Sequence, residues 1–287
     1  MWLFALVLVT DTIRTFPLAI SGPESLTVTV AGAGEPVVLV PGLFGSAFGY
    51  RRLIPLLTEA GYRAIVVEPL AIGTSARPDR ADYSLTAQAD RIAAALDQMG
   101  VRGAIVIAHS LGASMAYRMA YRRPDLVAGI VSIDGGPAER ATTPAFRRAM
   151  ELAPWIRLFG GINRVRRKIR AQLIRESVDT TWVSDAVVDG YTQGAARDLD
   201  ATLKAFVTMA QRREPERLRP HLSEIRCRVR LLVGTPSHDW GIGADEVTAL
   251  AEALPAFTVD SIEEVGHFIQ EERPEVIVAA VGRVRAP

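Results

Sequence analysis

The sequence predicts an α/β protein with a mainly parallel central sheet flanked by helices. Short apolar runs such as residues 37–40, 64–67 and 104–107 alternate with stretches of helical periodicity. Continuous apolar strands are typical of parallel sheets, because helices cover both faces of such a sheet. Ligands of these proteins bind beyond the carboxyl ends of the strands, so the loops at that edge are the first place to search for a site.

The elements follow from local patterns. The first predicted strand, residues 25–30, alternates polar and apolar side chains and is expected to be half-exposed, whereas the wholly apolar second strand is expected to be central. The predicted strands are residues 25–30, 37–40, 64–67, 104–107, 129–133, 229–233 and 258–262, and examples of predicted helices are residues 85–99 and 114–121.

The alternation of strands and helices stops in the middle of the chain. Apolar residues there recur at helical spacing, as in Leu199, Leu203, Phe206, Val207 and Ala210. We therefore expect three parts. They are an N-terminal apolar segment at 1–24, an α/β core at 25–136 and 226–287, and a helical cap at 137–225.

Composition excludes several functional classes. The 287 residues are 49% hydrophobic, and 33 Lys and Arg against 32 Asp and Glu leave a net charge of +1. We therefore expect a globular protein without a nucleic-acid partner. With a single cysteine, Cys227, and no His and carboxylate cluster at ligand spacing, no metal site is predicted. No dinucleotide cofactor is expected either, because Val37 stands where the third glycine of the binding loop belongs.

The first residues leave the compartment open. Residues 1–9 are apolar, too short a run to span a membrane, and a basic segment and a cleavage site are not evident around them. A cytoplasmic location is slightly favoured over export or membrane attachment through residues 1–10. The oligomeric state cannot be predicted.

The strongest chemical signal surrounds Ser110. The apolar run 104–107 leads into Ala108-His109-Ser110-Leu111-Gly112 and then into a helical pattern. A sharp strand-to-helix turn crowds the positions two before and two after the serine, and both residues there are small. Such a turn exposes the hydroxyl at a helix N-terminus, so Ser110 is the candidate nucleophile, with a simple helix cap as the alternative.

A serine nucleophile needs a base, and His267 is the candidate. It follows the last predicted strand and should return to the same sheet edge as Ser110. His109 is expected to pack, because adjacent residues on a tight turn point apart. His221 and His238 are expected to be surface or loop residues.

Two aspartates compete to orient the base. Asp239 lies in the loop after strand 229–233, and Asp134 directly ends strand 129–133. Asp239 is favoured because Ser110, Asp239 and His267 then follow one another in the Ser, Asp, His chain order that accompanies a serine on this kind of strand-to-helix turn. Asp134 stays the alternative acid.

The oxyanion needs two donors. Leu111 N–H lies directly after the nucleophile. Residues 41–46 leave a central strand with glycines that allow a close approach, and they offer the Leu43 N–H, with Phe44 as the alternative donor.

Together these motifs resemble those of the α/β-hydrolase superfamily, in the branch with a helical cap. The resemblance spans about residues 37–137 and 229–274. It implies the α/β-hydrolase fold and serine chemistry. Three departures are that Pro41 replaces a usual histidine, that Ala108 replaces a commoner glycine, and that the Asp239 loop is two residues longer than the common Gly-x-x-Asp form. Relatives that act as dehalogenases and epoxide hydrolases use aspartate as nucleophile, so with Ser110 the resemblance does not extend to their chemistry.

These observations predict a cofactor-free serine esterase of the carboxylesterase or lipase kind, acting on a small-molecule ester. Alternatives are carbon–carbon bond hydrolysis, acyl transfer or perhydrolysis by the same triad, or a ligand-binding protein without catalysis. An apolar acyl group is expected, because the cap offers apolar side chains for a pocket, namely Trp155, Leu158, Phe159, Trp182, Phe206 and Met209. The basic run at 164–170 is expected to be a solvated helix face, with membrane-surface association or attraction of an anionic substrate less favoured.

Overall fold

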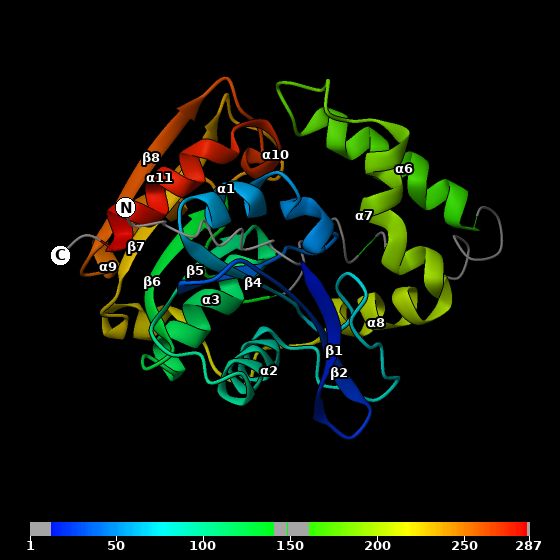
Figure 1. Ribbon diagram of the computed structural model, residues 1–287, viewed down its shortest axis with the longest axis horizontal. Coiled ribbons are helices and arrows are strands. Elements are labelled where there is room, and N and C mark those ends of the chain that lie inside the picture. The colour runs from blue at the N-terminus through cyan, green and yellow to red at the C-terminus, as the bar shows by residue number, and fades with distance from the viewer. Residues whose placement is uncertain (1–12, 141–147, 149–160, 286–287) are drawn as a thin grey trace, which may run out of the picture.

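The computed structural model describes residues 13–140, 148 and 161–285, and within them the chain folds around an eight-stranded sheet (Figure 1). The strands are β1 (Arg14–Ser21), β2 (Glu24–Ala31), β3 (Glu35–Val40), β4 (Tyr62–Glu68), β5 (Ala104–His109), β6 (Val127–Ile133), β7 (Arg228–Thr235) and β8 (Phe257–Glu263). Their order in the sheet is β1-β2-β4-β3-β5-β6-β7-β8. The pairs β1–β2 and β2–β4 are antiparallel, and every other pair is parallel.

Helices cover both faces of this sheet. Those packed around it are η1 (Ala47–Tyr50), α1 (Leu53–Glu59), α2 (Leu85–Gln98), α3 (Leu111–Arg122), α9 (Ala244–Ala253), α10 (Ile269–Glu272) and α11 (Pro274–Arg285). Helices α2 and α3 contribute to the core on one face, and α1 and α11 to the core on the other. The α2 helix begins where the Ser84 hydroxyl accepts a hydrogen bond from Ala87 N–H, and it ends before Gly100, whose φ is 64°.

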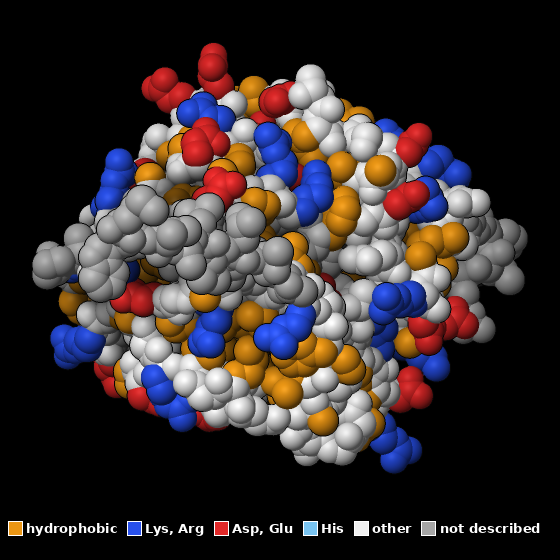
Figure 2. Space-filling model, in the orientation of Figure 1, with side chains coloured by type: hydrophobic (Ala, Val, Ile, Leu, Met, Phe, Trp, Pro, Cys, Tyr) orange, Lys and Arg blue, Asp and Glu red, His pale blue; other side chains and the backbone are white. Residues whose placement is uncertain are grey.

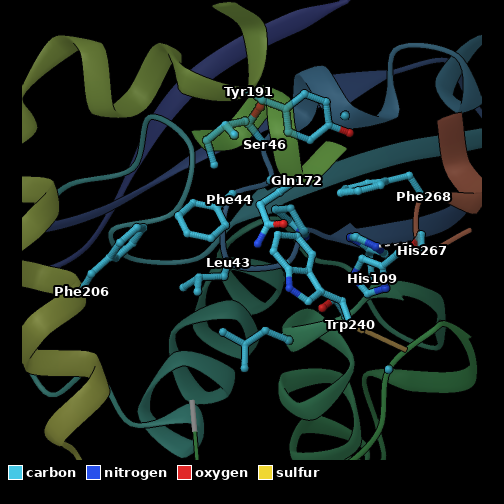
Figure 3. Close-up of a pocket in the computed structure, with 18 of the residues that line it drawn as sticks. Leu43, Phe44, Ser46, His109, Gln172, Tyr191, Phe206, Trp240, His267 and Phe268 are labelled. Atoms are coloured by element: carbon cyan, nitrogen blue, oxygen red, sulfur yellow. Dashed lines mark hydrogen bonds between the residues drawn. The ribbon is translucent and has the colours of Figure 1, made fainter. Parts of the chain in front are cut away.

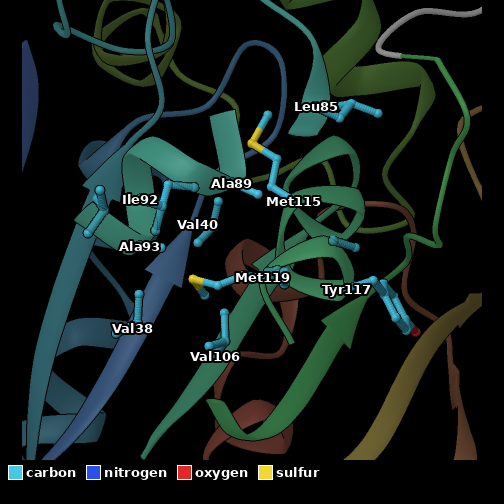
Figure 4. Close-up of a cluster of buried hydrophobic side chains, with 14 of the residues drawn as sticks. Val38, Val40, Leu85, Ala89, Ile92, Ala93, Val106, Met115, Tyr117 and Met119 are labelled. Atoms are coloured by element: carbon cyan, nitrogen blue, oxygen red, sulfur yellow. The ribbon is translucent and has the colours of Figure 1, made fainter. Parts of the chain in front are cut away.

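The central strands are wholly apolar because both of their faces are buried. Val38 and Val40 of β3 pack with α2 and α3, in the cluster drawn in Figure 4. Val37 and Leu39 of the same strand face α1 and α11. All four side chains are fully buried, and burying each contributes about 1.5–3 kcal/mol. A polar side chain at any of these positions would lose that contribution.

Every strand and both helices expected from the sequence are present, but the sheet begins earlier than predicted. The predicted core boundary at residue 25 is wrong, because β1 pairs along the whole of β2. That pairing makes β2 an interior strand. The expected half-exposed strand is wrong as well, because the polar residues Thr27 and Thr29 are buried together with the apolar ones. Within the predicted N-terminal segment, residues 1–12 lie outside the described residues.

A helical insertion separates β6 from β7. Its described helices are α6 (Gly161–Arg175), α7 (Asp185–Arg197), α8 (Leu199–Gln211) and η2 (Arg219–Glu224). This agrees with the helical pattern expected between residues 137 and 225. Figure 1 shows α6, α7 and α8 gathered at one side of the sheet.

The visible surface shows no concentration of one charge. In Figure 2, Lys and Arg side chains are interspersed with Asp and Glu side chains on the face viewed. In the described part of the chain, no helix has the length and apolar character needed to cross a membrane.

Candidate active site

The loops after six strands, β3 to β8, surround one cavity at the carboxyl edge of the sheet. The cavity has a volume of about 1350 Å³, and the helical insertion lines it from the other side. Ser110 follows β5, Asp134 follows β6 and His267 lies beyond β8, and all three line it. The parallel arrangement therefore brings together residues that are far apart in the sequence.

Ser110 occupies the sharp turn that the sequence predicts. Its φ of 51° and ψ of −120° fall in a backbone region that residues other than glycine rarely adopt. The turn is held by the Ser110 N–H, which donates to Ile133 O at 2.9 Å. A Cβ on Gly112 would lie 2.4 Å from Val40 O, which explains why only glycine fits at that position. Ala108 is fully buried.

The position of His267 depends on the helical insertion. Its backbone N–H donates to Glu176 O at 2.7 Å, just beyond α6. A Cβ on the preceding residue, Gly266, would lie 2.2 Å from that same oxygen. Glu272 accepts from Gly266 N–H with one carboxylate oxygen and from Val178 and Asp179 N–H with the other. Both glutamates are buried, and neither the contact of the Glu176 backbone nor that of the Glu272 carboxylate was expected from the sequence.

Asp134 holds the imidazole of His267. The Nδ1 of His267 lies 2.7 Å from Asp134 Oδ2, and both side chains are almost completely buried. Burial acts to raise the pKa of Asp134, but hydrogen bonds from His238 and His267 outweigh it and lower that pKa to about 2. An ionised acceptor on Nδ1 keeps the proton there and leaves Nε2 unprotonated to act as a base.

The expectation that Asp239 contacts His267 is therefore wrong. The Asp239 side chain is 75% exposed, and its Oδ2 lies 3.9 Å from Arg175 Nε. The preceding residue, His238, takes the place beside Asp134, and Asp239 faces solvent instead. Asp134, the alternative from the sequence, turns inward with a φ of 47°, which aspartate tolerates better than most residues.

The other three histidines differ in burial and in distance from the cavity. His109 packs as expected, with its ring 4.6 Å from that of His267 and its Nε2 3.0 Å from His267 O, and burial is the main cause that lowers its pKa to about 3. His221 lies away from the cavity, paired with Glu224. His238 lies in the loop after β7, in agreement with the expectation of a surface or loop residue, but it is not at the surface, because its Nε2 hydrogen-bonds to Asp134 Oδ2 and its side chain is 8% exposed.

The loop after β3 lies opposite the first turn of α3. Leu43, Phe44 and Leu111, the three predicted oxyanion donors, all line the cavity. The loop is held by Gly45 N–H, which donates to Gly42 O, and by Ala47 N–H, which donates to the buried carboxylate of Glu68. As the first residue of α3, Leu111 has an N–H without an acceptor in the preceding turn of the helix.

The cavity wall is mainly apolar. The predicted residue Phe206 lines it, whereas Trp182 and Met209 pack elsewhere, and Trp155, Leu158 and Phe159 lie outside the described residues. Further lining residues are Leu43, Phe44, Val165, Ile169, Leu173, Leu199, Leu203 and Trp240. Figure 3 shows Phe206 and Phe44 on one side of the cavity and His109 and His267 on the other.

Helix α6 adds positive charge to this wall. Arg164, Lys168 and Arg175 line the cavity from exposed positions. Arg166 and Arg170 pair instead with acids of α7, Asp189 and Asp185. The basic run is thus split between an ion-paired face and the cavity.

The three groups Asp134, His238 and His267 also form the cluster in the described residues whose ligand atoms could converge on a metal ion. The 2.7 Å separation of His267 Nδ1 and Asp134 Oδ2 is a hydrogen-bond distance. Ligand atoms at about 2.1 Å around a tetrahedral zinc ion would lie roughly 3.4 Å apart. The spacing therefore fits hydrogen bonds between these side chains.

Comparison with known proteins identifies the family of the chain. Residues 37–280 match the model of the alpha/beta hydrolase family. The chain belongs to that family. It is 23% identical over 243 residues to an uncharacterized hydrolase, YugF, of Bacillus subtilis, which covers 85% of this chain and 87% of YugF.

Relatives of stated activity match over shorter stretches. An epoxide hydrolase of Caballeronia sordidicola is 28% identical over 144 residues, 50% of this chain and 44% of that protein. A haloalkane dehalogenase of Mycolicibacterium paratuberculosis is 29% identical over 164 residues, 53% of this chain and 54% of that protein. The chain thus spans about half the length of these two relatives, and the matches support hydrolytic activity at the level of the family.

Solved structures show the same fold. Cfl2 from Burkholderia cenocepacia superposes with a TM-score of 0.78 and 24% identity over 94% of this chain and 95% of that one. A thermophilic esterase from Thermogutta terrifontis has a TM-score of 0.74 and 20% identity over 95% of this chain and 100% of that one.

The backbone of Ser110 generates a stability prediction. Because its φ of 51° favours glycine, we expect Ser110→Gly to exceed Ser110→Ala in the free energy of unfolding by about 1 kcal/mol. Ser114, inside α3, is the control, and there the order should reverse by a similar amount. Urea denaturation of the four variants measures both differences. Equal stability of the two Ser110 variants would show that the turn is not strained.

Proposed function

We propose that this hydrolase cleaves carboxylic esters through a catalytic triad of Ser110, His267 and Asp134. The observation that carries the proposal is the buried hydrogen bond of 2.7 Å between Asp134 and His267, at the cavity that Ser110 lines from its strained turn. The nucleophile position holds a serine hydroxyl, not the aspartate carboxylate that dehalogenases and epoxide hydrolases of this fold use as nucleophile. The relatives named as epoxide hydrolase and dehalogenase therefore support hydrolysis as a class but not their particular substrates for this chain.

In the first step, Ser110 Oγ attacks the ester carbonyl carbon and its proton passes to His267 Nε2. The carbonyl electron pair moves onto oxygen, where the N–H groups of Leu43 and Leu111 stabilise the negative charge, with Phe44 as the alternative to Leu43. Asp134 stabilises the imidazolium of His267. Collapse of the tetrahedral intermediate breaks the bond to the alkoxide, which leaves as the alcohol with the proton from His267.

In the second step, water replaces the alcohol. His267 takes a proton from the water, whose oxygen attacks the acyl-enzyme, and the acid is released when Ser110 Oγ regains the proton. The chain's own residues supply every proton transfer in this cycle, and the proposal includes no cofactor.

We propose that the helical insertion acts as a cap that selects an apolar acyl group. Leu203 and Phe206 of α8 face the cavity together with Phe44, which contacts the rings of Phe206 and Trp240. An apolar chain of a small-molecule ester would displace water from this wall. Arg164 and Lys168 are exposed and remain hydrated at its border.

The nucleophile is tested with a fluorophosphonate probe, which reacts with activated serines. We expect wild-type protein to be labelled and Ser110→Ala to lose both labelling and ester hydrolysis, because the attacking oxygen is removed. Ser237→Ala, at an exposed loop serine, is the control and should keep both. Labelling that persists in Ser110→Ala would sink the assignment, and an unlabelled wild type would favour a ligand-binding protein.

The acid is tested by a matched pair of amide substitutions. Asp134→Asn should lower kcat by about ten-thousand-fold, because an amide no longer fixes the tautomer of His267. Asp239→Asn should change kcat little, since its side chain is 75% exposed. Hydrolysis of one ester by both variants, with circular dichroism to confirm folding, compares them. A collapse only in Asp239→Asn would overturn the assignment.

Acyl specificity is tested with a series of straight-chain esters of one alcohol. We expect kcat/KM to rise by up to about fourfold per added methylene while the cavity is being filled, the equivalent of about 0.8 kcal/mol for each. A terminal carboxylate on the acyl chain should abolish that gain. A preference for half-esters of dicarboxylic acids would contradict an apolar acyl group and would assign substrate binding to Arg164 and Lys168.

A further inference from the structure

His238 contacts the same carboxylate oxygen that holds His267. Its Nε2 hydrogen-bonds to Asp134 Oδ2, and the ring centres of the two histidines lie 5.6 Å apart with an angle of 62° between the ring planes. The His238 side chain is 8% exposed, so this contact is largely shielded from water. The proposed reaction needs one histidine on that oxygen and gives the second one no task.

The surroundings of His238 favour its charged form. Its Nδ1 lies 3.2 Å from Pro236 O, so both ring nitrogens face oxygen atoms that accept hydrogen bonds. A neutral imidazole donates from a single nitrogen, and only the imidazolium satisfies both acceptors. The hydrogen bond to Asp134 is the largest cause that raises the pKa of His238, and it outweighs the opposing effect of burial.

Among the residues that the structure describes, few other charged groups face this pair. The buried Glu176, beyond α6, adds negative potential that raises the pKa of His238 further. His109 stays neutral, since burial lowers its pKa to about 3. Farther out, Asp239 is exposed and lies near Arg175. The balance at the site therefore depends mainly on Asp134 and the two histidines that share it.

We propose that His238 is a positioning residue that competes with His267 for Asp134 and thereby sets the acid limit of catalysis. This inference rests on the proposed function, because it concerns the base of the proposed triad. The loop after β7, in which the sequence suggested the catalytic acid Asp239, would then supply a histidine that adjusts the protonation of His267.

The physical reason is repulsion between like charges. Protonating His267 while His238 is charged places two imidazolium rings on one carboxylate, with 5.6 Å between the ring centres. A like charge at that distance disfavours the charged form of its neighbour. Charged His238 therefore keeps His267 free of its proton, and able to act as a base, at lower pH than Asp134 alone would allow.

The test compares the pH dependence of kcat/KM in two variants of opposite charge. His238→Gln places a neutral donor near the same oxygen at every pH, and we expect the acidic limb of its profile to move upward by about one pH unit. His238→Lys keeps a cation, and its limb should stay at or below that of the wild type. His221→Gln, at a histidine away from the cavity, is the matched control and should follow the wild type.

A purely structural role for His238 would change kcat or stability without moving the limb. The proposal is overturned if the limb of His238→Gln coincides with that of the wild type or moves to lower pH. Circular dichroism at each pH confirms that the variants are folded. If the glutamine variant does not fold, a lysine variant with a limb above that of the wild type overturns the proposal instead.

A second measurement does not depend on ester hydrolysis. In the Ser110→Ala background, NMR titration of the histidine ring nitrogens follows the protonation of His267 directly. Adding His238→Gln should move the His267 midpoint to higher pH, and an unchanged midpoint overturns the inference. A wild type that hydrolyses no ester would instead contradict the proposed function and leave this readout intact.

Discussion

The site depends on the buried carboxylate of Asp134. An ionised group away from water is stable only when its oxygens are paired, and here Ile242 N–H donates to Oδ1 while His238 and His267 both contact Oδ2. These three partners lie in the loops after β7 and β8. The same carboxylate that orients the proposed base therefore also joins two neighbouring loops to the end of β6.

The sheet edge and the insertion form one packed unit around the proposed base. Glu176 O and the Glu272 carboxylate fasten the backbone on both sides of Gly266, so the insertion and α10 fix the loop that carries His267. Phe268 then packs against Trp182 and Tyr191 of the insertion. The insertion therefore both lines the cavity that substrate would enter and holds the loop that carries the proposed base.

The strained turn at Ser110 persists because the surrounding backbone leaves no alternative. A Cβ on Gly135 would lie 2.4 Å from Ser110 O, as close as one on Gly112 would lie to Val40 O. The backbone segments that follow β3, β5 and β6 are therefore closely packed against one another around this turn. Such packing keeps a conformation that would cost about 1–3 kcal/mol if the chain could relax.

The sequence by itself determined seven of the eight strands of the sheet, the turn at Ser110 and the return of His267 to the same edge. Apolar runs and small flanking residues are local patterns, and parallel strands bring their carboxyl ends together. Only the tertiary structure decided between Asp134 and Asp239. Both follow strands at that edge, and the choice depends on how the loop after β7 folds, which places His238 against Asp134 and turns Asp239 to solvent. The pairing of β1 with β2 and the contact of Glu176 with His267 could not be predicted from the sequence either. Each joins two segments, and the local pattern of a segment does not indicate which other segment it contacts.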